Sequence, residues 1–219
     1  MGRRAARQKE EAGAIDWLLL LLSSTRLDQI EPRCFVGSNQ SGGTSDGLLP
    51  ETAAKHERIV KEASRLFRER GFENVSVAEV MKAAGLTHGA FYAHFASKEE
   101  LQAVAVAYGQ KVSLERVERN KDVRNKGSYA DRYLSPRHRD NPGDGCTMAA
   151  LAQEVARSTP ELKAAFEKGL EEILSAEAGD RKEAIFQTAA MLGGIVLARA
   201  VQDQRLSNEI LKSVSQKLG

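Results

Sequence analysis

The chain has little of what marks several large protein classes. Its 219 residues include only two cysteines, Cys34 and Cys146, which lie far apart in the sequence. Two distant cysteines provide no disulfide framework and suit a reducing compartment, so we expect the protein in the cytoplasm. No apolar run reaches the roughly 20 residues that a membrane-spanning helix requires. The longest, Thr188–Val201, is interrupted by Arg199. We therefore expect no membrane partner.

The sequence also lacks a strong charge of either sign. Its net charge is +2, and residues 51–111 carry nine Lys or Arg against eight Asp or Glu, a difference of +1. Any binding to nucleic acid must then depend on individually placed side chains rather than on a basic domain. Alternating runs of β-branched residues are nearly absent, whereas stretches rich in Ala, Leu, Glu and Arg are long. This composition predicts an all-α fold.

Patterns typical of catalytic and metal sites are missing as well. The four histidines, His56, His88, His94 and His138, show no metal-ligand spacing with one another or with the cysteines. Neither a glycine-rich phosphate loop nor a nucleophile elbow occurs in the sequence. We therefore expect no metal and no cofactor, and we do not expect an enzyme.

A composition shift divides the chain near residue 50. Residues 37–47, GSNQSGGTSDG, contain no apolar side chain and have the composition of a flexible linker. The preceding part has one short apolar helix candidate, Ile15–Leu22, and cannot build a core alone. Acidic residues before this apolar stretch, and its short length, argue against a signal peptide. We expect a disordered extension and linker over residues 1–50, followed by domains at 51–111 and 112–219.

Two helices with clear ends are predicted after the linker. Apolar residues from Ile59 to Phe67 follow helical spacing, and Gly71 is placed to end this first helix. Ser76 and Glu79 have the spacing of a capping box and predict the start of a second helix. Its inner face is Val77, Val80, Met81 and Ala84, and Gly85 stops it.

A third and a fourth helix follow directly. Thr87 is placed to cap a third helix that ends near Phe95, and Ser97 with Glu100 is a second capping box. This box opens a long helix through about Asn120. Its expected inner stripe is Leu101, Val104, Tyr108 and Val112.

The third helix, THGAFYAHF, has an unusual surface. On a helical wheel Phe91 and Phe95 fall together and point into the core, whereas the opposite side holds Gly89, Ala90 and Ala93. A solvated helix face normally carries charged residues, and a glycine there costs on the order of 1 kcal/mol relative to alanine. Small residues flanked by hydrogen-bonding ones indicate close approach to a partner surface. The major groove of DNA admits a helix and accepts such short side chains.

The segment VSVAEVMKAAGLTHGAFYAHFASKEEL, Val75–Leu101, resembles the DNA-binding domain of the tetracycline-repressor (TetR) family of bacterial transcription regulators. The pattern G-x-F-Y-x-H-F-x-S-K-E-x-L matches from Gly89 to Leu101, and the similarity extends over residues 56–108. The resemblance implies an all-α protein, with a three-helix helix-turn-helix domain followed by a helical domain for ligand binding and dimerisation. It implies operator contacts at Ser76, Thr87, His88, Gly89, Ala90, Tyr92, His94 and Lys98.

Different roles are expected for these residues. His88 and Ala90 are the best candidates for reading base edges. Thr87, Tyr92 and Ser76 are placed to contact phosphates, as is Lys98 in the first turn of the fourth helix. For His94 two interpretations stay open: an operator contact, or a structural hydrogen bond to a neighbouring backbone carbonyl.

In the C-terminal part, four longer helices are expected at about 146–157, 160–178, 181–202 and 207–218. A short helix near Ser128–Leu134 and a loop at Ser135–Gly145 precede them. Thr188–Val201 is apolar nearly all round and rich in small residues, so it must be covered on most sides. We expect residues 181–202, with 160–178 or 207–218, to form a homodimer interface. A twofold dimer predicts a palindromic operator.

The resemblance further implies a repressor that a small-molecule effector releases from its operator. The sequence does not locate the effector site; the candidates between helices are Tyr129, Tyr133, Met148, Gln153 and Met191. Residues of these types more often belong to an ordinary core. Cys146 has no neighbouring Lys or Arg in the sequence, so we expect a buried, inert thiol rather than a sensor.

Two other functions are compatible with parts of the sequence. In a helical enzyme or lipid-binding protein with no DNA role, residues 56–108 would serve only packing. In a membrane-tethered regulator, Trp17–Leu22 would be an interfacial anchor, but this segment is only about two turns long. The resemblance also makes residues 1–50 unusual, because family members begin shortly before the first helix. A start codon assigned too far upstream explains this better than a genuine arm.

Overall fold

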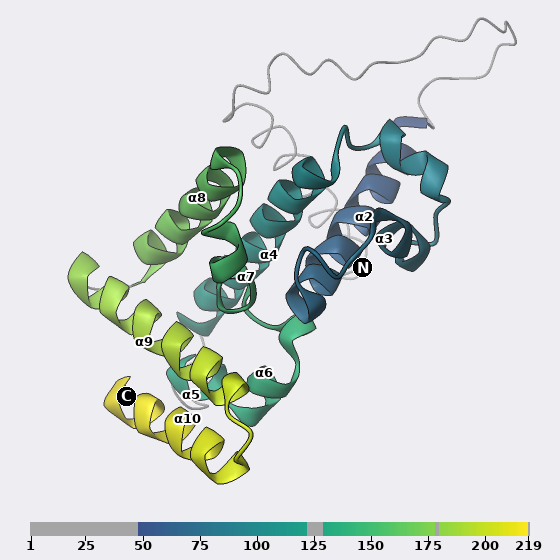
Figure 1. Ribbon diagram of the computed structural model, residues 1–219. Coiled ribbons are helices and arrows are strands. Elements are labelled where there is room, and N and C mark those ends of the chain that lie inside the picture. The colour runs from purple at the N-terminus through teal and green to yellow at the C-terminus, as the bar shows by residue number, and fades with distance from the viewer. Residues whose placement is uncertain (1–47, 122–128, 178–179, 219) are drawn as a thin grey trace, which may run out of the picture. The chain divides into compact units, whose positions relative to one another are not determined.

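The computed structural model describes residues 48–121, 129–177 and 180–218, and every element within these ranges is helical (Figure 1). The helix candidate Ile15–Leu22, the linker at 37–47 and the anchor segment Trp17–Leu22 lie outside the described residues. The elements are α2 (Leu48–Arg70), α3 (Val77–Ala83), the 3-10 helix η2 (His88–Ala93), α4 (Lys98–Lys121), α5 (Tyr129–Tyr133), α6 (Pro136–Asp140), the 3-10 helix η3 (Pro142–Asp144), α7 (Thr147–Val155), α8 (Pro160–Ala176), α9 (Arg181–Ala200) and α10 (Gln204–Leu218).

The predicted all-α fold class is confirmed. None of the described helices is both long and apolar enough to cross a membrane. α4 runs without a break through residue 111, so the domain boundary expected there stays a prediction.

Local signals define the ends of α2 and α3 as predicted. Gly71 ends α2 in a left-handed conformation, with φ of 80°, and its N–H donates to the Phe67 carbonyl over 2.8 Å. The Ser76–Glu79 capping box is formed in both directions: the Glu79 N–H donates to Ser76 Oγ, and the Ser76 N–H donates to the Glu79 carboxylate. Gly85, with φ of 69°, ends the turn after α3.

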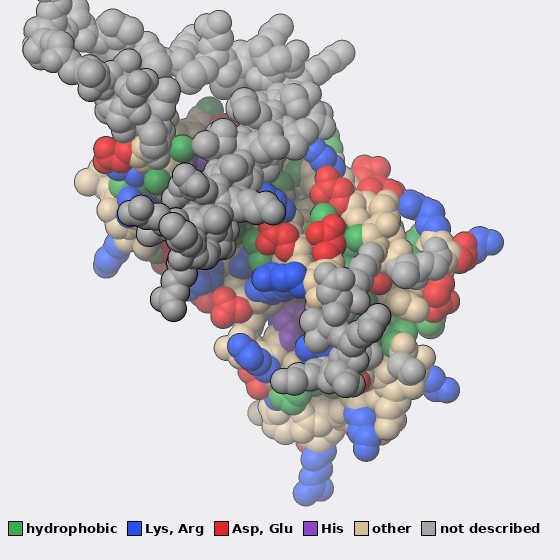
Figure 2. All heavy atoms as spheres, turned by 180° about the vertical axis from the view of Figure 1, so that it is seen from behind, with side chains coloured by type: hydrophobic (Ala, Val, Ile, Leu, Met, Phe, Trp, Pro, Cys, Tyr) green, Lys and Arg blue, Asp and Glu red, His purple; other side chains and the backbone are tan. Residues whose placement is uncertain are grey.

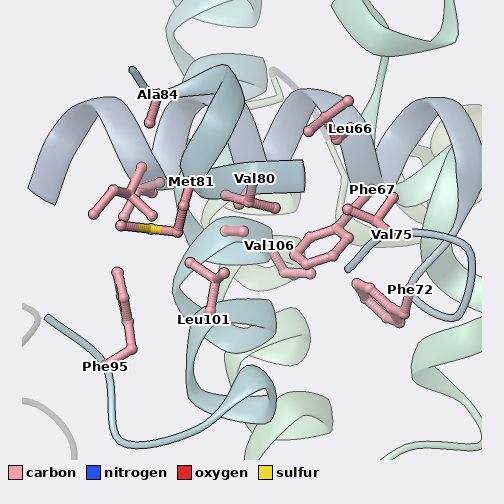
Figure 3. Packing of buried hydrophobic residues seen from close by; sticks show 14 of the residues in the cluster. Leu66, Phe67, Phe72, Val75, Val80, Met81, Ala84, Phe95, Leu101 and Val106 are labelled. Atoms are coloured by element: carbon pink, nitrogen blue, oxygen red, sulfur yellow. The ribbon is translucent and has the colours of Figure 1, made fainter. Parts of the chain in front are cut away.

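The buried side chains of α2, α3, η2 and α4 form one apolar cluster (Figure 3). Phe67, Met81, Phe91 and Leu101 are almost completely buried in it. The cluster continues into α7 and α8, so the helices that carry the candidate interface share a core with the C-terminal helices. Burial of an aromatic or large aliphatic side chain contributes about 1.5–3 kcal/mol, which makes this cluster the main stabilising feature of the N-terminal helices.

The third helix differs from its prediction. Residues 88–93 form a 3-10 helix rather than an α-helix, and the Thr87 side chain makes no capping hydrogen bond. The Ala90 N–H donates to the Thr87 carbonyl and the His94 N–H to the Phe91 carbonyl, both with 3-10 spacing. The segment is short, contains a glycine and has no acidic residue in its first turn. These features favour the tighter helix.

α4 buries more than the single stripe that was expected. Leu101 is fully buried, but Val104, Tyr108 and Val112 are only half-buried, whereas Ala105 and Val106 are buried completely. The reason is that α4 packs against α2 on one side and α8 on another (Figure 1). A helix covered on two sides has no single apolar stripe.

Residues 135–145, expected to be a loop, form α6 and η3. Ser135 Oγ accepts the His138 N–H, and Pro136 takes the first helical position, where proline is tolerated. The other end of α6 is held from far along the chain: Arg199 donates to the carbonyls of His138 and Arg139. Local sequence patterns do not contain this contact, so the helix was missed.

The last helices lie close to their predicted positions, and α9 pairs with α10 (Figure 1). Met191, Ile195 and Ala198 of α9 are buried against α5 and α10. Its other face is exposed and still apolar: Phe186 is 60% exposed and Leu197 57%.

η2 is fixed to α2 by an aromatic contact. The His56 ring of α2 stacks on Phe95, with centroids 4.7 Å apart, and lies 5.8 Å from the His94 ring. Burial, and secondarily the charge of His94, lower the pKa of His56 to about 4. Burial and the Lys55 charge lower the pKa of His94 as well. Both rings are therefore neutral at physiological pH.

Substitution of the two left-handed glycines should have unequal costs. Gly71→Ala forces alanine into a left-handed conformation and puts its Cβ onto the Glu154 carboxylate, whereas Gly85→Ala meets no atom within 4 Å. We expect a loss of about 1 kcal/mol for Gly85→Ala and at least twice that for Gly71→Ala. Urea unfolding of the two variants measures the difference; equal losses would show that the Glu154 contact has no energetic weight.

His56 should make stability depend on pH. Above pH 6.5 the ring is neutral in both the folded and the unfolded chain. Between about pH 6.5 and pH 4 only the unfolded chain takes up the proton, so the free energy of unfolding falls as the pH falls. Because the side chain is only partly buried, we expect a loss of about 1–3 kcal/mol over this range.

The check is urea unfolding of the parent and of His56→Phe at several pH values across this range. The Phe variant keeps an aromatic ring at position 56 and should flatten the profile by most of this loss. A variant profile as steep as that of the parent would rule His56 out as the cause.

Candidate nucleic-acid interface

The outer surface of η2 is formed by small, uncharged side chains. Gly89 and Ala93 are exposed, and a Cβ at Gly89 would meet no atom within 4 Å. Nothing in the described residues therefore requires a glycine there. Tyr92 is 72% exposed, which is unusual for a large aromatic side chain. The inner side is anchored by Phe91 and Phe95, which are 1% and 2% exposed.

The residues that begin η2 are accessible. Thr87 and His88 are both exposed, and the Thr87 hydroxyl is not used for capping. The His88 ring lies beside Tyr92, with centroids 6.5 Å apart. A hydroxyl, an imidazole and a phenol thus border the small residues at Gly89 and Ala93.

Two of the expected operator contacts are less accessible. Ala90 is half-buried and packs against the apolar cluster, so only part of its surface can face a partner. His94 is also half-buried, and its ring is directed towards His56 and Phe95. This arrangement favours the structural role for His94. Its contact is with aromatic rings, not with the backbone carbonyl that was considered.

Ser76 and Lys98 lie at helix starts on either side of η2. The Ser76 hydroxyl is occupied: it accepts the Glu79 N–H and donates to Glu79 Oε2 over 2.8 Å. The Ser76 N–H and then the Ser76 hydroxyl donate to the Glu79 carboxylate and, followed by the bond from Arg70, lower the pKa of this carboxyl to about 2. A phosphate at Ser76 would have to share this capping network. Lys98 is the first residue of α4 and is half-buried.

Charged residues of both signs are interspersed on the molecular face shown in Figure 2, and they do not gather into one basic patch. This agrees with the near balance of charges in residues 51–111. Attraction of a polyanion to the N-terminal helices therefore has to come from local groups such as Lys98 and helix N-termini rather than from a general field.

A second candidate site lies among the C-terminal helices. A groove of about 840 Å³ is bordered by α4, α5, α6 and η3, and a partly open cavity of about 20 Å³ adjoins it. Tyr129, Tyr133 and Cys146 line both spaces, as does Ser113. The hydroxyls of Tyr133 and Thr188 are buried without a hydrogen-bond partner among the described residues. Burial raises the pKa of Tyr129 and Tyr133, so both phenols stay protonated.

Four of the five effector candidates from the sequence meet at this cavity: Tyr129, Tyr133, Met148 and Met191 line it. Gln153 does not; it is exposed on α7 and lines neither space. Sequence reasoning missed Ser113, Thr188 and Glu177 of the cavity and Arg116, His138 and Asp144 of the groove. Their sequence signal is weak, because they belong to helix interiors or to the segment that was expected to be a loop.

His138 connects the walls of the groove. Its Nδ1 lies 2.7 Å from the Tyr133 carbonyl, and its Nε2 accepts the Cys146 N–H over 2.9 Å. Only a neutral ring protonated at Nδ1 satisfies both bonds. Burial lowers the pKa of His138, in agreement with this assignment. No group of three or more His, Cys, Asp or Glu side chains within the described ranges could hold a metal ion.

Comparison with known proteins identifies the N-terminal helices. Residues 59–104 match the family model described as bacterial regulatory proteins, tetR family. The HTH-type transcriptional regulator YerO of Bacillus subtilis is 44% identical over 54 residues, which are 25% of this chain and 19% of that protein. AcrR of Shigella flexneri is 41% identical over 51 residues, 23% of this chain and 24% of that protein. The match thus spans a quarter or less of the length of these two relatives.

Solved structures resemble more of the chain. The reduced form of Escherichia coli NemR has a TM-score of 0.59 at 21% identity and covers 75% of this chain and 95% of its own. A TetR regulator from Legionella pneumophila has a TM-score of 0.59 at 15% identity and covers 82% and 100%. At these identities the likeness shows a shared fold. The matching family and relatives are transcriptional regulators and not enzymes. Residues 59–104 therefore carry the domain that the model of the tetR family of bacterial regulatory proteins describes.

Proposed function

We propose that this protein is a transcriptional repressor that binds a palindromic operator as a homodimer and is released by a small-molecule effector. The observation that carries the DNA contact is the outer surface of η2. It exposes Gly89 and Ala93 between the polar side chains of Thr87, His88 and Tyr92. A helix with such a surface can approach base edges closely, and its flanking groups can reach phosphates.

The internal anchoring of η2 supports this assignment over a purely structural one. Packing explains Phe91 and Phe95, which are buried, but gives no reason for an exposed glycine with open space around it. In our proposal His88 reads a base edge and Tyr92 and Thr87 contact phosphates. Lys98 and Ser76, each at the N-terminus of a helix, contact phosphates of the DNA backbone, because the free N–H groups there suit a phosphate. Ala90 and His94 contribute less, because they are half-buried.

The effector would bind among the C-terminal helices, at the groove and cavity that share Tyr129, Tyr133 and Cys146. Aromatic and methionine side chains supply apolar walls, and the buried Tyr133 and Thr188 hydroxyls supply hydrogen-bonding groups. These groups belong to the small cavity, whereas the larger groove is bordered mainly by polar and charged side chains, including Arg116, Arg132 and Asp144. We expect the regulator to act in the cytoplasm, where its DNA target lies.

The exposed face of α9 supports the homodimer. Ile185, Phe186, Val196 and Leu197 are all more than 40% exposed, and the exposed small residues Ala189 and Gly193 lie among them. An apolar helix face of this kind marks a protein contact, and small residues allow close backbone approach. Two such faces related by a twofold axis would cover each other.

Gly89→Glu should abolish operator binding and leave the fold intact. The substitution puts a carboxylate where base edges and phosphates would lie, which costs several kcal/mol, so we expect an affinity loss on the order of 100-fold or more. At an open, exposed site the stability change should stay within about 0.5 kcal/mol. Ala156→Glu, at an exposed position at the end of α7, is the matched control.

Operator DNA for this test is first enriched from random duplexes by the unmodified protein, and gel shift then measures the affinity of each variant. Retained binding by Gly89→Glu would contradict the proposed contact surface. If the unmodified protein enriches no duplex at all, the proposed function itself fails.

Leu197→Glu should convert the dimer to a monomer, because it buries a charge in the apolar face at α9. Ala54→Glu introduces the same carboxylate at an exposed position of α2 and should leave the dimer unchanged. Sedimentation at micromolar concentration measures both variants. A monomeric parent protein, or a Leu197→Glu variant that remains dimeric, would contradict the proposed interface.

A further inference from the structure

A polar junction joins α2, α4 and the start of α7. The Arg68 guanidinium of α2 donates from Nε and Nη2 to the Gly143 carbonyl of η3, over 2.9 and 2.5 Å. Its Nη1 donates to Ser64 Oγ over 2.5 Å and is 3.5 Å from Thr147 Oγ1. Thr147 and Ser64 are 0% and 1% exposed. One side chain of α2 therefore holds a segment that lies about 75 residues further along the chain.

The helices approach each other closely at this junction. A Cβ at Gly109 of α4 would overlap Thr147, Arg68 and Ser64. A Cβ at Gly143 would overlap the Glu69 side chain of α2. Two glycines thus allow α2, α4 and η3 to meet. A junction packed in this way has discrete arrangements rather than a continuous range of them.

The same short segment forms a wall of the groove. Asp144 and Cys146, between Gly143 and Thr147, both line it. Arg116 of α4 donates to the Asp144 carbonyl over 2.6 Å, and the Cys146 N–H donates to His138. Residues 143–147 therefore have one side against the groove and the other against Arg68.

A second bond ties the end of α2 to α7. The Phe72 N–H, directly after the helix, donates to Glu154 Oε2 over 2.6 Å. α7 thus contacts α2 at its N-terminal end through Thr147 and near its C-terminal end through Glu154. A shift of α7 would strain both contacts with α2, and α2 also holds Phe95, just after η2, through the ring of His56.

A contribution to stability does not by itself explain why an arginine stands at position 68. Within the described part of the chain no carboxylate pairs with it, and burial lowers the pKa of its guanidinium. Packed apolar side chains at such a site generally stabilise a fold as well as a buried charge or better. The hydrogen bonds of a buried guanidinium instead specify one arrangement of the groups around it. These bonds break together when the carbonyl moves away.

We propose that Arg68 is the positioning residue that couples the C-terminal groove to the DNA-reading helices, through its contacts with residues 143–147. This inference rests on the proposed function, because it requires an operator-bound state. In that state the hydrogen bonds of Arg68 to this segment are formed. Displacement of the groove wall breaks these bonds and lets α2, with α3 and η2, leave its operator-binding position.

Reciprocal linkage allows a test without knowledge of the effector. If the groove influences operator affinity, then operator binding must influence the groove. Cys146 lies in the coupling segment and is nearly buried, so its rate of reaction with 5,5′-dithiobis(2-nitrobenzoic acid) reports opening. The measurement uses the full chain with Cys34→Ser and compares the rate with and without saturating operator duplex from the enrichment.

In this background we expect operator DNA to slow the labelling of Cys146 by about fivefold or more, within the usual range of coupling. Arg68→Met should label faster without DNA and lose most of the slowing when operator is bound. Arg65→Met is the matched control: Arg65 lies on the same helix but pairs at the surface with Glu62 and Glu69. It should retain the slowing.

Operator occupancy is checked by gel shift for each variant. If Arg68→Met binds DNA too weakly, Ser64→Ala removes one hydrogen bond of the junction and should reduce the slowing in part. Full slowing in a variant that lacks a junction bond would overturn the proposal, as would a labelling rate that operator does not change in the Cys34→Ser protein. Failure of the parent to enrich any duplex would instead refute the proposed function.

Discussion

The candidate interface depends on the burial of Phe91 and Phe95. These two rings pack into the cluster shared by α2, α3 and α4, and they fix a six-residue 3-10 helix that has few local features to stabilise it. Because the anchoring is entirely on the inner side, the outer side is free to carry residues chosen for a partner. Gly89 and Ala93 are residues of that kind, and they have no role in the packing of the chain itself.

Much of the N-terminal part could be predicted from sequence because its signals are local. The capping box at Ser76 and the glycine at Gly71 each act within a few residues, and both helix ends lie where the sequence indicated. The exposure of Gly89 and Ala93 was likewise predictable from the pattern of THGAFYAHF, whereas Ala90, expected on the same side, is half-buried. The 3-10 geometry of η2 was not predictable, because the wheel assumed α-helical spacing.

Features that depend on distant contacts were missed. α6 exists because Ser135 caps it locally and Arg199 caps it from α9, and only the first of these is visible in a local pattern. The two-sided burial of α4 follows from its position between α2 and α8. The hydroxyl of Thr188 became a cavity group only when α9 was packed against the rest. The junction at Arg68 is of the same kind, because its partners come from η3 and α7.

In the proposed complex the outer surface of η2 enters the major groove of an operator in two symmetric copies. Methylation interference with dimethyl sulfate tests it most directly, because guanine N7 lies in the major groove and adenine N3 in the minor groove. We predict that methylation of guanine N7 at two positions related by twofold symmetry prevents binding of the enriched duplex. Interference from adenine N3 alone, or from no position at all, would contradict the account.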